Sequence, residues 1–257
     1  LLEAQGAKVV GVPVDREGLV LERIPDATRL IYVTPAPQFP LGVPMSERRR
    51  RALLARADEL GAIVIEDDYD SEFRYEGRPA DSLQSMDEHG RVAFVGTFSK
   101  TLSPDLRLGY LVAPPAVLEA VGTARHLTDW HTSTQAQWAL AKFIPDGALN
   151  RHTPRCHAAY AARRERIVQR FAGDLSPWFE LLPVTAGIHM AAICRREIDI
   201  GQLIALARRV DVGLYPLAPF FHFSPPRPGL MLGFGAIDEA DIDPSLDRVR
   251  DVLLQMG

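Results

Sequence analysis

Short apolar runs separated by polar turns make up the first part of the chain. Alternating or β-branched runs of this kind are typical of strands, and those closed by a proline or an acidic cluster are typical of buried strands. The predicted strands are residues 9–14, 30–33, 62–65, 92–95 and 108–112. A helix is predicted between the second and the third, because Ser46 suits an N-cap and Gly61 suits the left-handed residue that ends a helix. This order favours an α/β fold with a mostly parallel sheet flanked by helices.

The second part of the chain is predicted to be richer in helix and to close with a small α+β unit. The apolar spacing predicts helices at 117–121 and 149–172, strands at 179–184 and 188–193, a helix at 200–210, a strand at 230–234 and a helix at 245–256. We therefore expect a large domain over residues 1–172 and a small C-terminal α+β domain over residues 173–257.

Composition narrows the class of protein. The chain has 257 residues, of which 47% are apolar and 24% are charged, as in a globular chain with a sizeable core. No apolar run approaches the ~20 residues of a membrane helix, so no membrane partner is expected. The net charge of −4 argues against a DNA-binding surface on the chain itself. Two cysteines without a CxxC pair favour a reducing cytoplasm over a disulfide framework, and no metal-ligand spacing is present.

Two strand ends carry unusual chemistry. The predicted strand 62–65 is followed by Glu66-Asp67-Asp68-Tyr69. The predicted strand 92–95 is followed shortly by Thr97-Phe98-Ser99-Lys100, and Arg107 comes soon after. A lysine at a desolvated strand end can form a Schiff base with a carbonyl cofactor. A carboxylate such as Asp67 can keep a pyridine nitrogen protonated, and Tyr69 can donate to a phenolic oxygen. Small hydroxyls and a guanidinium can hold a phosphate. Together these groups predict a site for pyridoxal 5′-phosphate (PLP).

Plainer interpretations remain open for several of these residues. Asp67 and Tyr69 could be a strand cap and an edge aromatic. Arg107 could pair with an acidic neighbour such as Asp105 or Glu72. His189, on a predicted strand that faces the cleft, is either a satisfied buried histidine or a catalytic base.

Longer motifs around these residues resemble a known family. Thr97-Phe98-Ser99-Lys100-Thr101-Leu102 with Arg107-Leu108-Gly109-Tyr110 resembles the lysine motif of fold-type I, class I/II aminotransferases. The segment from Asp67 to Tyr75, with Tyr32-Val33-Thr34-Pro35 and Gln38-Phe39-Pro40-Leu41-Gly42, resembles the aminotransferase-like domain of MocR-type regulators of the GntR superfamily. The similarity continues to Leu232-Gly233-Phe234-Gly235.

The resemblance implies a role for each matching residue. Lys100 would hold PLP as an internal aldimine and Asp67 would face the pyridine nitrogen. Tyr69 would donate to the ring oxygen, while Ser99, Arg107 and Thr97 would hold the phosphate. It also implies the PLP-dependent transferase fold type I and a homodimer. In family members a winged helix-turn-helix module and the first part of the large domain precede the matching region. The chain starts with Leu rather than Met, and we expect these pieces to be missing.

Two positions depart from the pattern of true aminotransferases, and a third departs from that of MocR-type proteins. Phe39 stands where an Asn would bond the ring oxygen, and Pro37 where many MocR-type proteins have His. Met231 stands where an Arg would clamp the substrate carboxylate, and Met offers no comparable donors. Amino-acid recognition of the ordinary kind is therefore in question, while the cofactor residues are intact.

Two functions follow as hypotheses. The first is the effector-sensing domain of a transcriptional regulator. Its signal is either PLP itself or a small amine or amino acid that displaces Lys100 from PLP, and it shifts the balance between two domain arrangements. The second is a PLP-dependent aminotransferase acting on an amino acid and a 2-oxo acid, with Lys100 as the general base. Met231 and Phe39 favour the first. A third possibility is that this chain alone binds no cofactor.

Overall fold

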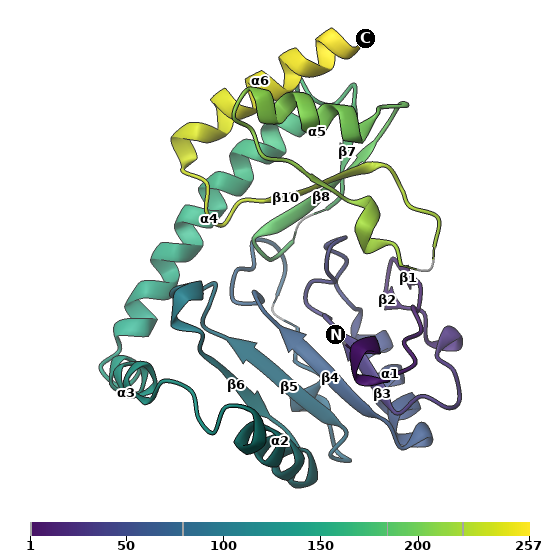
Figure 1. The fold of residues 1–257 in the computed structure, drawn as a ribbon, viewed down its shortest axis with the longest axis vertical. Helices are drawn as coiled ribbons and strands as arrows, with labels where there is room; N and C mark the ends of the chain where they lie inside the picture. The colour runs from purple at the N-terminus through teal and green to yellow at the C-terminus, as the bar shows by residue number, and fades with distance from the viewer. Residues whose placement is uncertain (1, 79, 184, 223) are drawn as a thin grey trace.

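Two four-stranded sheets, one above the other in Figure 1, organise the molecule. The computed structural model describes residues 2–78, 80–183, 185–222 and 224–257. The first sheet has the order β3-β4-β5-β6. Its strands are β3 (Leu30–Val33), β4 (Ile63–Asp68), β5 (Val92–Thr97) and β6 (Gly109–Val112). The first three run parallel and β6 is antiparallel to β5, so the carboxyl ends of β3, β4 and β5 meet at one edge.

Helix α1 (Glu47–Leu60) covers part of the first sheet and forms as its sequence predicts. The Ser46 side chain accepts a hydrogen bond from the Arg49 N–H, and Gly61 ends the helix with φ +63°. Leu53 and Ala57 are fully buried in a core cluster with Val64 of β4. Local capping and one apolar face thus fix the helix that supports the strand carrying Asp67.

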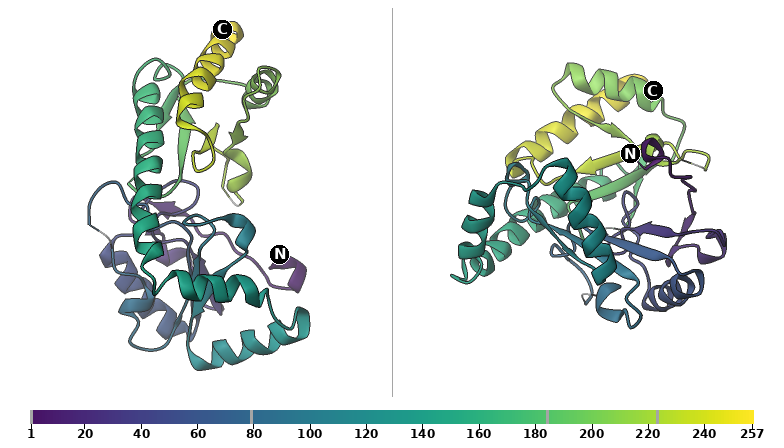
Figure 2. Two further views of the ribbon diagram at one scale, coloured as in Figure 1. Left: turned by 90° about the vertical axis from the view of Figure 1, so that its left-hand side faces the viewer. Right: turned by 60° about the horizontal axis from the view of Figure 1, so that its bottom comes forward.

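Three helices follow the first sheet: α2 (Pro115–Thr128), α3 (Thr134–Phe143) and α4 (Ala148–Ala172). Helix α4 runs from the level of the first sheet to the level of the second, as the left view of Figure 2 shows. Pro154 lies inside α4. The arginines near the C-terminal end of α4 bond to the elements beyond it; Arg170, for example, pairs with Asp174 and Asp247.

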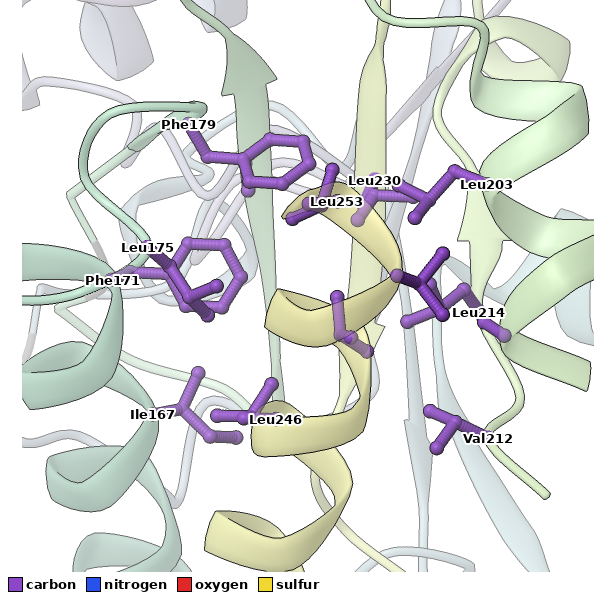
Figure 3. Packing of buried hydrophobic residues seen from close by; sticks show 14 of the residues in the cluster. Ile167, Phe171, Leu175, Phe179, Leu203, Val212, Leu214, Leu230, Leu246 and Leu253 are labelled. Atoms are coloured by element: carbon purple, nitrogen blue, oxygen red, sulfur yellow. The ribbon is translucent and has the colours of Figure 1, made fainter. Parts of the chain in front are cut away.

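The second sheet is antiparallel and has the order β7-β8-β10-β9. Its strands are β7 (Phe179–Leu181), β8 (His189–Cys194), β9 (Tyr215–Pro216) and β10 (Gly229–Gly233). Helices α5 (Ile200–Arg209) and α6 (Glu239–Met256) pack with α4 around the larger core cluster. Figure 3 shows Leu246 and Leu253 of α6 between the α4 and α5 sides of this core.

Short elements complete the described chain. A two-stranded hairpin is formed by β1 (Val14–Asp15) and β2 (Gly18–Leu19), and the 3₁₀ helices are η1 (Glu3–Gln5), η2 (Leu21–Arg23), η3 (Gln84–Met86), η4 (Pro104–Leu106) and η5 (Ala218–Phe220). Within the described part of the chain, every helix is too short or too polar to span a lipid bilayer.

The structure corrects four of the predicted elements. Residues 9–14 form no long strand, since only Val14 enters a ladder. The predicted strand 30–33 was expected to be buried, but β3 is buried on one face alone: Leu30 and Tyr32 are exposed. Helix α3 was not predicted, and α6 begins at Glu239 rather than at residue 245, with Pro244 inside it. The predicted strand 179–184 is β7, three residues long; its last position, Val184, lies outside the described residues. The predicted domain boundary at residues 172/173 stays a prediction.

Candidate active site

A cavity of about 1830 Å³ runs along β3 from its amino end to the carboxyl ends of β4 and β5, and it reaches the second sheet. Four of the residues predicted for the site line it: Asp67, Tyr69, Ser99 and Lys100. They come from the ends of β4 and β5, and the second sheet contributes His189 and Gly233. Parallel strands therefore bring the predicted residues to one edge, as expected for ligand sites in α/β sheets.

Asp67 is the carboxylate of the site and is held by a tyrosine from the neighbouring strand. The Tyr32 hydroxyl donates a hydrogen bond to Asp67 Oδ2. Partial burial, and then the adjacent Asp67 carboxylate, raise the pKa of Tyr32, so this hydroxyl remains a donor at neutral pH. The bond fixes Asp67 at the cavity wall and leaves its other oxygen available to a ligand.

Tyr69 supplies a protonated phenol two residues further on. Burial raises the pKa of its hydroxyl, and the carboxylates of Asp70, Asp67 and Asp68 raise it further. The hydroxyl oxygen lies 3.5 Å from Nε2 of His189, and the Phe39 ring meets the Tyr69 ring edge-on with centroids 6.1 Å apart. Tyr69 is therefore a neutral hydrogen-bond donor in a confined position.

Lys100 lies in a turn that leaves β5 and is anchored by its own backbone. The Leu102 N–H donates to the Phe98 carbonyl at 2.8 Å, and the Ser99 N–H donates to Thr97 Oγ1 at 3.1 Å. Helix α4 holds the same turn from the other side, because the Tyr160 hydroxyl donates to the Lys100 carbonyl at 3.1 Å. The half-buried lysine is thus presented to the cavity on a fixed backbone.

Thr97 and Arg107 are placed differently from the other predicted residues. Neither lines the cavity, and the Thr97 hydroxyl is engaged within the turn. Arg107 is exposed, follows η4 with φ +51°, and forms no ion pair with any described residue, so the alternative pairing with Asp105 or Glu72 is not seen. A positive φ is strained for an arginine, and Trp130 and Asp211, which lie outside the site, also adopt it.

Three further residues of the site were not among the predicted site residues. Exposed and buried residues alternate along β3, and this alternation was the one sequence signal that could have placed Tyr32 beside Asp67. Tyr160 contacts Lys100 from α4, and Phe39 contacts Tyr69 from the loop after β3. No local sequence pattern predicts either contact.

Met231 lies on β10, where it packs beside a small buried cluster. That cluster is formed by Ala191, Ile193 and Leu217, and Leu41 also packs against it. The Met231 side chain therefore belongs to an apolar environment, and it does not line the cavity.

The donor set of the cavity fits PLP. A primary amine can condense with the aldehyde, a carboxylate can face the pyridine nitrogen, and a protonated phenol can donate to the ring oxygen. Lys100, Asp67 and Tyr69, which all line this cavity, provide these three groups.

Comparison with known proteins agrees with this assignment. The family model "Aminotransferase class I and II" matches residues 3–212. The chain is 36% identical over 256 residues to the probable rhizopine catabolism regulatory protein MocR of Rhizobium meliloti, covering 99% of this chain and 52% of that protein. It is 34% identical to the pyridoxine biosynthesis transcriptional regulator PdxR of Corynebacterium glutamicum, covering 96% of this chain and 54% of that protein. The chain thus spans about half the length of these relatives.

Solved structures give the same result for the fold. An archaeal alanine:glyoxylate aminotransferase superposes with a TM-score of 0.90 at 26% identity, covering 99% of this chain and 66% of that one. The kynurenine aminotransferase of Pyrococcus horikoshii, crystallised with PMP, superposes with a TM-score of 0.87 at 27% identity, covering 96% and 63%. The predicted PLP-dependent transferase fold type I and the resemblance to MocR-type regulators are confirmed. The chain belongs to the class I and II aminotransferase family.

Proposed function

We propose that this chain is the PLP-binding, effector-sensing part of a transcriptional regulator, with PLP joined covalently to Lys100. The observation that carries the proposal is the convergence of Asp67, Tyr69 and Lys100 on one cavity. The regulator relatives, which match nearly the whole chain, support sensing as the use of that cavity.

Each residue has a defined task in this proposal. Bound PLP supplies an electron-poor ring and an aldehyde that captures amines. Lys100 Nζ attaches the aldehyde, Asp67 holds a proton on the pyridine nitrogen, and the Tyr69 hydroxyl donates to the ring oxygen. Ser99, together with Thr97 and Arg107, binds the phosphate; this requires Arg107 to turn toward the cavity from its exposed position.

The signal in this proposal is a small amine or amino acid that competes with Lys100 for the aldehyde. Met231 lies in an apolar cluster and offers no donor to a carboxylate, which supports capture of a ligand over turnover of common amino acids. We further propose a large domain over residues 1–172, a small domain over residues 173–257, a homodimer, a cytoplasmic location, and DNA contact only through an upstream module.

A titration with PLP tests the proposal. Adding PLP to the protein should produce the absorbance band of a protein-bound Schiff base, and Lys100→Ala should abolish it. Lys8→Ala is a matched control, because Lys8 also lines the cavity but is exposed and distant in sequence from the strand ends. The control should keep the band. A wild-type spectrum identical to that of Lys100→Ala would refute cofactor binding.

The alternative function is a PLP-dependent aminotransferase acting on an amino acid and a 2-oxo acid. One observation favours it: Lys100, Asp67 and Tyr69 are all in place in a fold that superposes on solved aminotransferases. Sustained production of a 2-oxo acid from an amino donor, over many turnovers per chain, would establish the enzyme and overturn the sensor. A single turnover that then stops is the expected result for a sensor.

A further inference from the structure

Helix α4 directs three polar side chains at four-residue spacing to the turn that carries Lys100. They are His152, Cys156 and Tyr160, and residues four apart are neighbours on a helix surface. None of the three was among the predicted site residues. Each contacts a backbone carbonyl of the turn, at Lys100 or at Thr101. We refer to the three residues as the α4 clamp.

The α4 clamp holds the turn through two carbonyl groups. The Tyr160 hydroxyl donates to the Lys100 carbonyl at 3.1 Å. Nε2 of His152 lies 2.8 Å from the Thr101 carbonyl oxygen and must carry the proton of this bond, because a carbonyl can only accept. The Cys156 thiol, whose sulfur lies 3.1 Å from that nitrogen, donates to the same carbonyl at 3.5 Å. A carbonyl oxygen has two lone pairs and can accept both bonds, so each donor uses its proton once.

The ring of Tyr160 is fixed by its neighbours, so its hydroxyl has a defined position. Phe73, which is fully buried, meets this ring edge-on with the centroids 4.7 Å apart. The guanidinium carbon of Arg163 lies 5.6 Å from the centroid of the same ring. On the side of the turn, Thr101 is 5% exposed. Hydrogen bonds to groups with little access to water are costly to lose, since water cannot replace the missing donor.

The residues before Lys100 are anchored without α4. The Phe98 N–H donates to the Leu108 carbonyl at 3.1 Å, and the Ser99 N–H donates to Thr97 Oγ1 at 3.1 Å. Thr97 is the last residue of β5, and Leu108 directly precedes β6. Loss of a donor of the α4 clamp should therefore loosen the backbone from Lys100 onward and leave Ser99 in place.

We propose that Tyr160 and His152 are positioning residues for Lys100. Their bonds fix the carbonyls of Lys100 and Thr101, and with them the point from which the lysine side chain reaches into the cavity. The consequence for PLP rests on the proposed function, in which Lys100 Nζ condenses with the aldehyde, forms a C=N bond and releases one water. A backbone that is already fixed loses less conformational freedom on this attachment, so the α4 clamp favours it.

The first test needs no cofactor and reads the backbone by nitrogen-15 NMR. The wild type should give order parameters of about 0.85 at Lys100 and Thr101, the value of rigid backbone. The variant Tyr160→Phe/His152→Leu lacks both main donors, so its values at these two residues should fall to about 0.6, while that of Val64 in β4 stays unchanged. Unchanged values at Lys100 and Thr101 would overturn the proposal, as would an equal fall at Val64, which would show a general loosening. If this variant does not fold, Tyr160→Phe alone must show the fall at Lys100.

The second test compares PLP with pyridoxine 5′-phosphate, an analogue whose alcohol cannot join an amine. Tyr160→Phe should weaken PLP about fivefold, the value of one hydrogen bond, and should change the affinity of the analogue by less than about twofold. His152→Leu should behave in the same way, whereas His152→Gln keeps an N–H donor and should stay within about twofold of the wild type for both ligands. Tyr215→Phe is the matched control and should leave both affinities unchanged, since Tyr215 is 64% exposed and does not line the cavity. An equal loss for both ligands would show a merely structural role or a direct contact with the cofactor, and would refute the proposal.

A double-mutant cycle with the lysine gives an independent check. In Lys100→Ala, PLP can bind only without the covalent bond, so Tyr160→Phe should alter its affinity by less than about twofold in this background. A loss of about fivefold in both backgrounds would mean that Tyr160 acts on the site without Lys100, and would refute the proposal.

The outcomes separate this proposal from the proposed function. If the wild type attaches no PLP at Lys100, cofactor attachment is refuted, and the order parameters of the free protein still decide the role of the α4 clamp. If PLP attaches but both ligands lose affinity equally, the positioning role fails and cofactor attachment stands.

Discussion

Arg50 allows the sharpest prediction about stability. It is 1% exposed and donates to three backbone carbonyls: Pro35 at 2.9 Å, Met45 at 3.1 Å and Asp81 at 3.1 Å. Its NH1 also lies 3.8 Å from Glu66 Oε1, which is 2% exposed. Arg50→Met removes all four contacts and leaves a buried carboxylate without its cation. Breaking a buried pair in this way destabilises a protein by about 3–5 kcal/mol.

The ionisation of Glu66 makes the loss of stability in Arg50→Met depend on pH. Burial raises its pKa, while the Leu83 and Gln84 N–H groups and the Arg50 charge act against that rise. Removing Arg50 raises the pKa of Glu66 further. The folded variant therefore keeps a proton on Glu66 at a pH where the unfolded chain has released it. Stability then falls as pH rises from about 4, the ordinary value of a glutamate, through the folded pKa. The deficit of Arg50→Met should therefore be smaller at pH 5 than at pH 8.

Urea unfolding followed by circular dichroism measures both effects. Arg51→Met is the matched control on the same helix, because its side chain is 70% exposed and its one ion pair with a described residue is that with Glu47. This control should change stability by less than about 1 kcal/mol. A loss for Arg50→Met no larger than that of the control, or a deficit that grows on acidification, would refute the reasoning. Pro35 and Met45 line the cavity, so PLP binding should weaken as well.

Other predictions concern the site strand, the site carboxylate and a cysteine. Gly96→Ala should destabilise the protein by about 1–3 kcal/mol in the same urea assay, because the new Cβ overlaps the Tyr110 ring; a neutral change would contradict the packing. Asp67→Asn keeps an acceptor for Tyr32, so it should leave the urea midpoint nearly unchanged while PLP affinity falls at least about tenfold. Burial raises the pKa of Cys194 to about 11. Its alkylation at pH 8, followed by peptide mass spectrometry, should therefore be about a hundredfold slower than that of a free thiol. An equal rate would contradict the burial.

Local signals made a large part of the fold predictable. Ser46 and Gly61 carry the chemistry of helix ends, and the bounds of α1 follow from them. Helix α3 was not predicted; it is ten residues long, none of its residues is buried, and Trp138, its largest side chain, is 76% exposed. Helix α6 begins six residues earlier than predicted and continues through Pro244, although a proline beyond the first turn cannot donate the usual hydrogen bond to the carbonyl four residues before it.

The site was predictable to the extent that sheet topology could place it. Asp67, Tyr69 and Lys100 follow parallel strands, and the ends of such strands share an edge. Contacts between distant parts of the chain were beyond reach: His189 meets Tyr69 across 120 residues, and Tyr160 meets Lys100 across 60. The sequence analysis placed His189 on a strand facing the site but left its role open, and its contacts with Tyr69 and Phe39 are visible only in three dimensions.

Chemical trapping of the cofactor tests the central claim most directly. The chain has three lysines, at positions 8, 100 and 142. Incubation with PLP, reduction with borohydride and peptide mass spectrometry should place a single pyridoxyl group on Lys100. Lys8 and Lys142 should remain unmodified at equimolar PLP. Absence of the group, or its even distribution over the three lysines, would contradict the account.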